Sequence, residues 1–237
     1  MRTAVVTGAA RGLGEAIAKR LAADGDRVLL ADVNLAGAEA VAAAIGGEAI
    51  EHDVRSLESW KRLLAQAGDV DVLVNNAART EIRSFWEIDL DEWDDVLATN
   101  LRGTYLGIRV VGAQMRDRGA GRIVNLASIA GQGSRAVTGV HYATSKAAIL
   151  ALTRHAATEL AGSGVTVNAI APGYMETDNT AALRADVERE RTIVARIPAG
   201  RWGTPGDIQG AFVFLASDAA TYVTGAVLPV DGGWLVR

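Results

Sequence analysis

The sequence has no cysteine and few histidines, prolines and aromatic residues. The absence of cysteine excludes disulfides and thiolate metal sites. The three histidines, His52, His141 and His155, are too dispersed along the chain to suggest a cluster, so we expect no metal site. Any redox chemistry must therefore come from an organic cofactor.

Long apolar runs and concentrated positive charge are also missing. No apolar run approaches the roughly 20 residues of a membrane span. The first one, Ala4 to Val6, is followed by glycine-rich sequence, which is not the pattern of a signal peptide. The formal net charge is −4, and the scattered Lys and Arg residues form no basic run that would bind nucleic acid. We expect a cytoplasmic protein with neither a membrane nor a nucleic-acid partner.

What the chain does contain is a regular alternation of β-branched and Ala/Leu-rich segments. No Pro/Ser-rich linker interrupts its 237 residues, so one domain over residues 1–237 is expected. Strands are predicted at 3–7, 27–32, 71–76, 121–128, 165–172 and 226–233, with a weaker one ending at Asp53. Helices are predicted over Leu13–Asp24, Asp91–Arg118 and Tyr142–Ala161. Continuous apolar strands between helices predict an α/β fold with a parallel sheet covered on both faces.

Ligands of such a sheet bind beyond the carboxyl ends of its strands. The first predicted strand is followed there by TGAARGLG, which places Gly8, Gly12 and Gly14 before a helix. Glycines permit a tight turn and let the backbone approach a pyrophosphate at the helix N-terminus. The spacing differs from the commoner G-x-G-x-x-G, and a glycine-rich turn of this kind also serves as plain structure.

Asp32 at the end of the second predicted strand strengthens the nucleotide interpretation. It lies 18 residues beyond Gly14, where a carboxylate accepts both ribose hydroxyls and repels a 2′-phosphate. Arg11, a cation inside the loop, would instead assist a 2′-phosphate, but Val33 supplies no basic partner. NAD is therefore favoured over NADP.

The end of the weak third strand offers a further nucleotide contact. Asp53 and Val54 are placed to read the adenine amino group and the ring face. Alternatively, Asp53 caps a helix that starts near Ser56, and the sequence does not separate the two interpretations.

The stretch HYATSK, residues 141–146, places Tyr142 four residues before Lys146, on one helical face. A tyrosine has a pKa of roughly 10, and a neighbouring positive charge lowers it. The pair therefore predicts a proton-transferring phenol, although the same spacing often occurs by accident.

Two further polar residues fit the same chemistry. Ser128 ends a predicted strand, where its hydroxyl would bind a substrate oxygen or cap a helix. Asn100 lies within a predicted helix, where its amide would bind a water that relays protons from Lys146 or would mark a bend.

Together these features resemble the short-chain dehydrogenase/reductase family over nearly the whole chain. The motifs occur in the family's order: TGAARGLG, Asp32, NNAA at 75–78, Asn100, Ser128, Tyr142, Lys146 and APG at 171–173. The resemblance implies a single Rossmann-type, doubly wound parallel sheet of about seven strands and a nicotinamide cofactor. It also implies that Ser128 orients the substrate oxygen, Tyr142 transfers the proton, Lys146 lowers the tyrosine pKa and holds the ribose, and Asn100 anchors a water relay.

The same resemblance assigns the cofactor contacts and the assembly. The implied cofactor-binding residues are Gly8, Arg11, Gly12, Leu13, Gly14, Asp32, Asp53, Val54, Asn76, Ala77, Tyr142, Lys146, Pro172, Gly173, Met175 and Thr177. Ala78 departs from the family, which usually has glycine there. A homotetramer is implied, in which the helices Asp91–Arg118 and Tyr142–Ala161 pack against symmetry mates.

The substrate is expected to be a small alcohol or ketone covered by a loop at about 173–204. The C-terminal third is similar to the 2-dehydro-3-deoxy-D-gluconate 5-dehydrogenase and 2-deoxy-D-gluconate 3-dehydrogenase branch, at YMETDNTAALRAD, RIPAGRWG and VDGGWLVR. A sugar acid needs a cation for its carboxylate, and the candidates are Arg79, Arg83, Arg135 and Arg184. One alternative is an oxidoreductase for another secondary alcohol or ketone, including 3-oxoacyl thioesters, for which NADP is a possible cofactor. A second alternative is a non-catalytic dinucleotide sensor.

Overall fold

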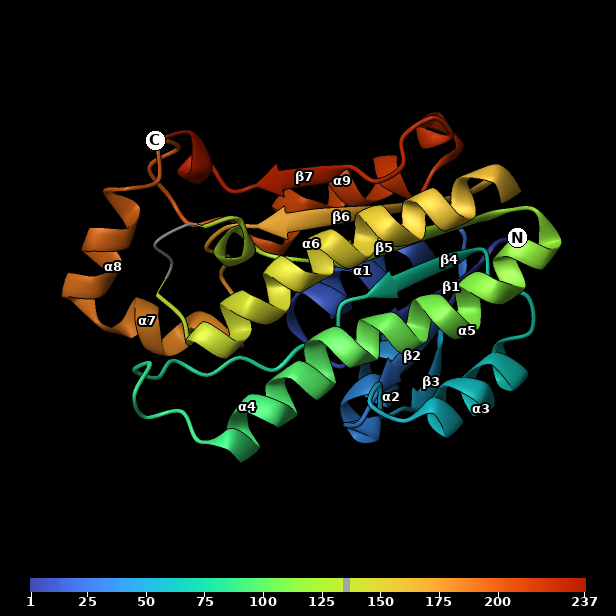
Figure 1. Ribbon diagram of the computed structural model, residues 1–237, viewed down its shortest axis with the longest axis horizontal. Helices are drawn as coiled ribbons and strands as arrows, with labels where there is room; N and C mark the ends of the chain where they lie inside the picture. The colour runs from blue at the N-terminus through green and yellow to red at the C-terminus, as the bar shows by residue number, and fades with distance from the viewer. Residues whose placement is uncertain (134–136) are drawn as a thin grey trace.

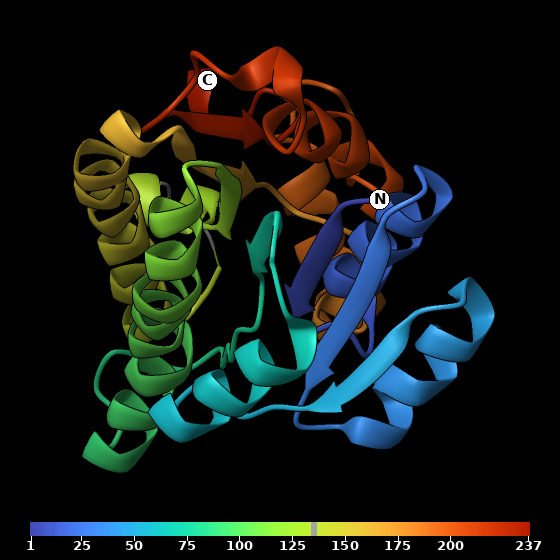
Figure 2. The same cartoon turned by 90° about the vertical axis from the view of Figure 1, so that its right-hand side faces the viewer.

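The computed structural model describes residues 1–133 and 137–237, and within them the chain forms one parallel sheet. Seven strands lie in the order β3-β2-β1-β4-β5-β6-β7 (Figures 1 and 2). Their bounds are β1 Thr3–Thr7, β2 Arg27–Asp32, β3 Glu48–Glu51, β4 Val72–Asn75, β5 Gly121–Leu126, β6 Val165–Pro172 and β7 Val227–Val230. The reversal of strand order between β1 and β4 creates the crevice in which ligands of doubly wound sheets bind. The predicted fold class is confirmed.

Helices cover both faces of the sheet, because alternate strand side chains point to opposite sides. On one face Ala4 and Val6 of β1 are buried among residues of three helices: α1 Gly12–Ala23, α2 Leu35–Ile45 and α9 Gln209–Leu215. On the other face Val5 packs with α3 Leu57–Ala67, α5 Gly103–Arg118 and α6 Val140–Leu160. Figure 1 views α5 and α6 in front of the sheet. Within the described residues, no helix has the length and apolar character to cross a membrane.

A helix runs through the predicted span Asp91–Arg118, as expected, but its middle widens into a π-helical turn. The chain forms α4 Leu90–Leu97, a π-helical turn at Ala98–Arg102, and then α5. Asn100 lies in the π-helical turn with no exposed surface, and its carbonyl accepts a hydrogen bond from the Thr104 hydroxyl (2.7 Å). Widened turns of this kind often occur at functional sites. The structure thus shows a local departure from α-helical geometry at Asn100, in the form of a widened turn.

A small lobe lies beyond the carboxyl ends of β5, β6 and β7. It contains α7 Ala181–Ala185 and α8 Val187–Val194, on the left in Figure 1. Its own apolar cluster is centred on the Tyr174 ring, which packs against Trp202 and Trp234 with centroid separations of 5.1 and 4.9 Å. This packing holds residues 173–204 above the strand ends.

Candidate active site

A cavity of about 790 Å³ opens at the carboxyl ends of the strands. Its walls come from the loops after strands β1 to β6, from the start of α6 and from the small lobe. Most of the predicted site residues line it: Gly8, Arg11, Gly12, Leu13, Asp32, Asp53, Val54, Asn76, Ala77, Ser128, Tyr142, Lys146, Pro172, Gly173, Met175 and Thr177. Gly14 and Asn100 are not among the lining residues. The fold therefore brings together groups that are far apart in the sequence.

The glycine loop forms a tight cradle at one end of this cavity. Gly8 and Gly12 have φ values of 65° and 63°, which side chains rarely adopt. A Cβ on Gly8 would also lie 2.8 Å from the Ala77 Cα atom. Thr177 of the small lobe lies on the other side of Gly12, 3.8 Å from where a Cβ would stand. The backbone is thus accessible from the cavity, as binding of a pyrophosphate requires.

Gly14 acts beneath the loop instead of in the cavity wall. A Cβ there would overlap the Gly8 carbonyl oxygen and come within 2.5 Å of the Asn76 side-chain nitrogen. Gly14 therefore lets the first turn of α1 pack closely against the loop.

Gly14→Ala is expected to lower the free energy of unfolding by about 1–3 kcal/mol, because the added methyl has no room. Gly210→Ala is the control, since that glycine is exposed in helix α9 with no atom within 4 Å of the new Cβ. The control should leave stability unchanged or raise it by up to about 1 kcal/mol. Urea denaturation measures both, and equal effects would contradict this packing role.

Thr7 organises the strand ends around the cradle, a role not anticipated from the sequence. Its buried hydroxyl donates to the Val74 carbonyl (3.2 Å) and accepts from the backbone N–H groups of Asn76 (3.0 Å) and Ala77 (3.1 Å). The Asn76 amide in turn donates to the carbonyls of Thr7 and Gly8 at 2.9 and 3.0 Å. The side chain of Asn76 therefore fixes the glycine loop. A hydroxyl directly before the first glycine was the sequence signal for this arrangement.

Asp32 occupies the end of β2, where a ribose carboxylate is expected. Its two carboxylate oxygens accept from the backbone N–H groups of Ala10 (3.0 Å) and Asn34 (2.9 Å), which fixes the side chain beside the glycine loop. Val33 next to it is 67% exposed and lines the same cavity. The glycine cradle and this oriented carboxylate together fit a nicotinamide dinucleotide.

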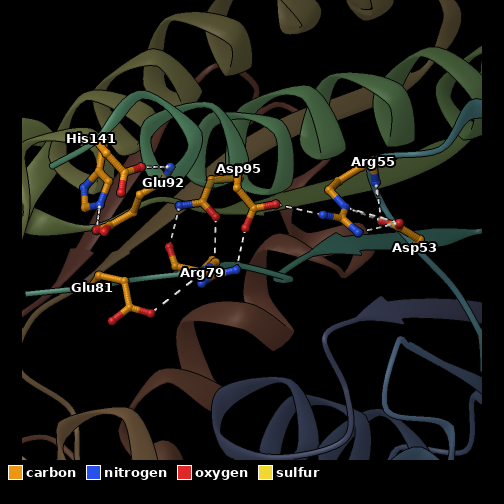
Figure 3. A network of polar contacts seen from close by, with 9 residues as sticks. Asp53, Arg55, Arg79, Glu81, Glu92, Asp95 and His141 are labelled. Carbon is orange, nitrogen blue, oxygen red and sulfur yellow. Dashed lines mark hydrogen bonds and ion pairs between the residues drawn. The ribbon is translucent and has the colours of Figure 1, made fainter.

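Asp53 is held by an arginine and does not cap a helix. Arg55 contacts both Asp53 carboxylate oxygens at 2.9 to 3.2 Å, and these hydrogen bonds lower the pKa of the carboxyl group. Ser56 caps α3 by accepting from the Ser59 backbone N–H (3.2 Å). The helix-cap alternative for Asp53 is therefore excluded. Arg55 also pairs with Asp95, so the rim of the cavity here is a chain of charges (Figure 3).

Tyr142 and Ser128 lie together in the cavity wall. Burial raises the pKa of the Tyr142 phenol, and a hydrogen bond with Ser128 lowers it in part. The Ser128 hydroxyl also accepts from the Ala130 backbone N–H (3.1 Å), so it caps a short 3-10 turn as well. The cap foreseen as an alternative for Ser128 is therefore present, and its role towards a substrate oxygen stays a prediction. The two hydroxyl groups are close enough to bind the same substrate oxygen.

Lys146 is 2% exposed, with its ammonium 5.5 Å from the centroid of the Tyr142 ring. It donates to the Leu126 carbonyl at 2.6 Å, and burial lowers its own pKa to about 7. The side chains by themselves do not lower the Tyr142 pKa, contrary to the effect predicted for the pair. The reason is that burial acts against the charged form of both groups.

Protein groups hold the Asn100 amide in place, and the water relay expected there stays a prediction. Its oxygen accepts from the Arg79 backbone N–H (2.7 Å), and its nitrogen donates to the Arg79 carbonyl (2.9 Å) and the Ser145 hydroxyl (3.0 Å). Ser145 in turn donates to the Tyr142 carbonyl at 2.7 Å. Asn100 therefore joins the chain after β4 to the start of α6. It does so through Ser145, the residue directly before Lys146.

The candidate arginines separate by position. Arg79 lines the cavity and pairs with Asp95 (Figure 3). Arg83 instead pairs with Glu92 (2.6 Å) and is not part of the cavity wall. Arg184 is also outside the wall, 4.0 Å from the nearest Glu176 oxygen. Arg135 lies outside the described residues. Of the three described candidates, only Arg79 reaches the cavity.

Known proteins resemble this chain over its full length. A family model described as enoyl-(acyl carrier protein) reductase matches residues 8–235. The 2-dehydro-3-deoxy-D-gluconate 5-dehydrogenase of Pseudoalteromonas atlantica is 41% identical, covering 100% of this chain and 96% of that protein. The 3-oxoacyl-(acyl-carrier-protein) reductase FabG of Vibrio harveyi is 40% identical, covering 98% of this chain and 96% of that protein.

A solved structure agrees with the fold in detail. It comes from Beutenbergia cavernae and is assigned provisionally as an NAD(P)-dependent gluconate 5-dehydrogenase with bound NADP at low occupancy. The TM-score is 0.95 at 48% identity, and the match covers 100% of this chain and 97% of that one. The structural match therefore covers both the strands and loops that carry the candidate cofactor residues and the small lobe.

Proposed function

The chain belongs to the short-chain dehydrogenase/reductase family and is an NAD(P)-dependent oxidoreductase acting on CH–OH groups; from that premise we propose that it interconverts a secondary hydroxyl and a ketone on a short polyhydroxy acid, such as a deoxygluconate. The family relatives that are named above are all dehydrogenases or reductases, so the sensor alternative is not retained.

The observation that carries the proposal is the convergence of Ser128, Tyr142 and Lys146 in one cavity with the glycine cradle. The nicotinamide supplies hydride transfer to or from the carbon that bears the oxygen. Ser128 and Tyr142 bind that oxygen, and the Tyr142 phenol gives or takes its proton. Lys146 holds the ribose and places a positive charge near the phenolate. Pro172, Gly173, Met175 and Thr177 would hold the nicotinamide carboxamide. Residues 173–204 would form the substrate cover of a single domain.

The substrate end of the cavity suits a hydroxyl-rich anion. The buried Thr138 hydroxyl lines it without a hydrogen-bond partner among the described residues, and such a group is matched by a polar ligand. Arg79 contacts Asp95 and, at 3.8 Å, Glu81, and its guanidinium carries further N–H donors beyond these two contacts. The likeness to a sugar-acid dehydrogenase over the full chain supports the same substrate class.

Turnover with NAD and a panel of sugar acids, their uncharged lactones and the parent polyols tests this proposal. We expect the acids to be preferred. Arg79→Ala should then raise KM for an acid about tenfold or more, and far less for its lactone, because a charge-assisted contact is lost. Arg20→Ala is the matched control, because Arg20 of α1 pairs with Asp24 and is not part of the cavity wall. Equal activity on uncharged cyclic alcohols, with no penalty from Arg79→Ala, would refute the substrate class.

Reduction of 3-oxoacyl thioesters is the second candidate. The Vibrio harveyi reductase is nearly as similar to this chain as the sugar-acid dehydrogenase is. The two proposals differ in the cofactor that they require. Biosynthetic reduction draws on NADPH, whereas the Asp32 carboxylate repels a 2′-phosphate. An acetoacetyl thioester added to the same panel decides between them.

Asp32 leads us to propose NAD as the preferred cofactor, although the Beutenbergia relative holds NADP at low occupancy. Asp32→Ser with Val33→Arg should shift the ratio of kcat/KM towards NADP by at least about tenfold, because a repulsive charge is replaced by a phosphate partner. Val33→Leu is the control and should leave the ratio unchanged. Steady-state kinetics in which wild type already prefers NADP would show that Arg11 outweighs Asp32.

We also propose a homotetramer. α4, α5 and α6 border an open groove of about 970 Å³ whose walls include Leu97, Leu101, Tyr105 and Leu152. Apolar side chains along a groove of this kind suit a symmetry mate. Light scattering at micromolar concentration checks the mass, and a monomer would contradict the proposal.

A further inference from the structure

The residue directly before Tyr142 is a histidine with no exposed surface. His141 is not part of the cavity wall, and none of the roles assigned above includes it. It lies in the first turn of α6, where backbone N–H groups have no partner within the helix. Its Nδ1 atom accepts from the backbone N–H of Tyr142 at 2.9 Å. The side chain thus holds the backbone of the proposed proton-transferring residue.

The opposite edge of the imidazole is fixed by a carboxylate from another helix. Nε2 lies 2.9 Å from a carboxylate oxygen of Glu92 in α4. Because Nδ1 accepts a hydrogen bond, the ring hydrogen must be on Nε2, which donates a hydrogen bond to Glu92. This assigns the Nε2–H tautomer of the neutral ring. The other Glu92 oxygen pairs with Arg83 at 2.6 Å, so the carboxylate is itself oriented. Figure 3 shows the ring between α6 and the Glu92 carboxylate.

The surrounding backbone is built to accommodate this ring. A Cβ on Gly139 would overlap the His141 ring, so glycine at the helix cap makes room for it. The Gly139 N–H donates to the Glu81 carbonyl at 3.0 Å. Together with the Asn100 contacts to Arg79, the segment 79–83 is tied to the first turn of α6 at three points. Residues 79–82 and Tyr142 face the same cavity.

We propose that His141 is a positioning residue: with Glu92 and Arg83 it sets where Tyr142 stands relative to the substrate oxygen and to segment 79–83. The proposal rests on the proposed function, because it assumes that Tyr142 transfers the proton. His141 itself touches neither the cavity nor the reacting atoms. Proton transfer depends steeply on distance, so a small displacement of the phenol slows the chemical step without weakening cofactor binding.

The test compares kcat, KM, cofactor affinity and the solvent isotope effect of matched variants. His141→Leu removes both ring contacts, and we expect kcat to fall about 10- to 100-fold, a larger solvent isotope effect and cofactor affinity within about twofold of wild type. His141→Asn keeps an acceptor at the place of Nδ1 and should recover most of kcat. His141→Gln keeps only a reach towards Glu92 and should recover less.

Glu92 gives a second pair of variants that act from another helix. Glu92→Gln keeps an acceptor for the Nε2 proton and should hold kcat within about threefold, whereas Glu92→Leu removes it and should repeat the loss seen in His141→Leu. This pair decides the matter even where His141→Leu does not fold.

Tyr142→Phe in the same assays distinguishes a failure of the proposed function from a failure of the positioning role of His141. If Tyr142→Phe keeps its turnover, the proposed function fails and the positioning role falls with it. If Tyr142→Phe loses turnover but Glu92→Leu and the His141 variants keep wild-type kcat and isotope effect, the positioning role alone is wrong. A loss of kcat that His141→Asn does not recover would likewise overturn it.

Discussion

Tyr142→Phe is expected to lower turnover by at least about a hundredfold while cofactor affinity stays within about twofold. The phenol is the group placed beside Ser128 in the cavity wall, and general acid–base catalysis contributes roughly 10²–10⁴-fold. Phenylalanine keeps the ring and its packing but removes the proton. Steady-state rates and cofactor titration by tryptophan fluorescence measure the two effects separately.

Thr144→Val is the matched control for that substitution. Thr144 is exposed on the same turn of α6 and is not part of the cavity wall, so the loss of its hydroxyl should leave turnover unchanged. A Tyr142→Phe protein that retains near-normal rate would remove the proton role from Tyr142.

Lys146→Met is expected to lower turnover at least about a hundredfold and to weaken cofactor binding as well, which distinguishes it from Tyr142→Phe. Methionine fills a similar volume, but it supplies neither the positive charge near the phenolate nor a donor for the ribose. Unchanged cofactor affinity in this variant would assign Lys146 to the tyrosine alone.

The same variant has a stability signature with a defined sign. Burial lowers the Lys146 pKa from 10.5 to about 7, so between these values the unfolded chain holds a proton that the folded chain has released. The free energy of unfolding of the wild-type protein should therefore rise with pH in that window, by on the order of 1 kcal/mol per pH unit, and level off below about pH 7. Lys146→Met removes this slope. Urea denaturation of both proteins in cofactor-free buffer from pH 6 to 9.5 gives the difference in the free energy of unfolding at each pH. Parallel curves for the two proteins would contradict the lowered pKa of the buried lysine.

The sequence by itself determined the alternation of strands and helices, and it placed the candidate site residues at the carboxyl ends of the strands. Continuous apolar runs such as Val72–Asn75 are strands because only a sheet covered on both faces buries them fully. Gly8 and Gly12 were identifiable because a tight turn restricts which residue types it accepts. Tyr142 and Lys146 share a helical face by spacing alone. These are local rules, and each involves neighbours a few residues apart.

What only the tertiary structure decided is which side chains meet across elements. The π-helical turn at Asn100, its contacts to the Arg79 backbone 21 residues away, and the pairing of His141 with Glu92 49 residues away have no local signature. Packing likewise decided that Arg79 lines the cavity and Arg83 does not. It also buries Tyr142 and Lys146, and burial disfavours the charged form of both side chains. Spacing along a chain fixes the period of a helix or strand, but hydrogen-bond partners and desolvation depend on which surfaces come together when those elements pack.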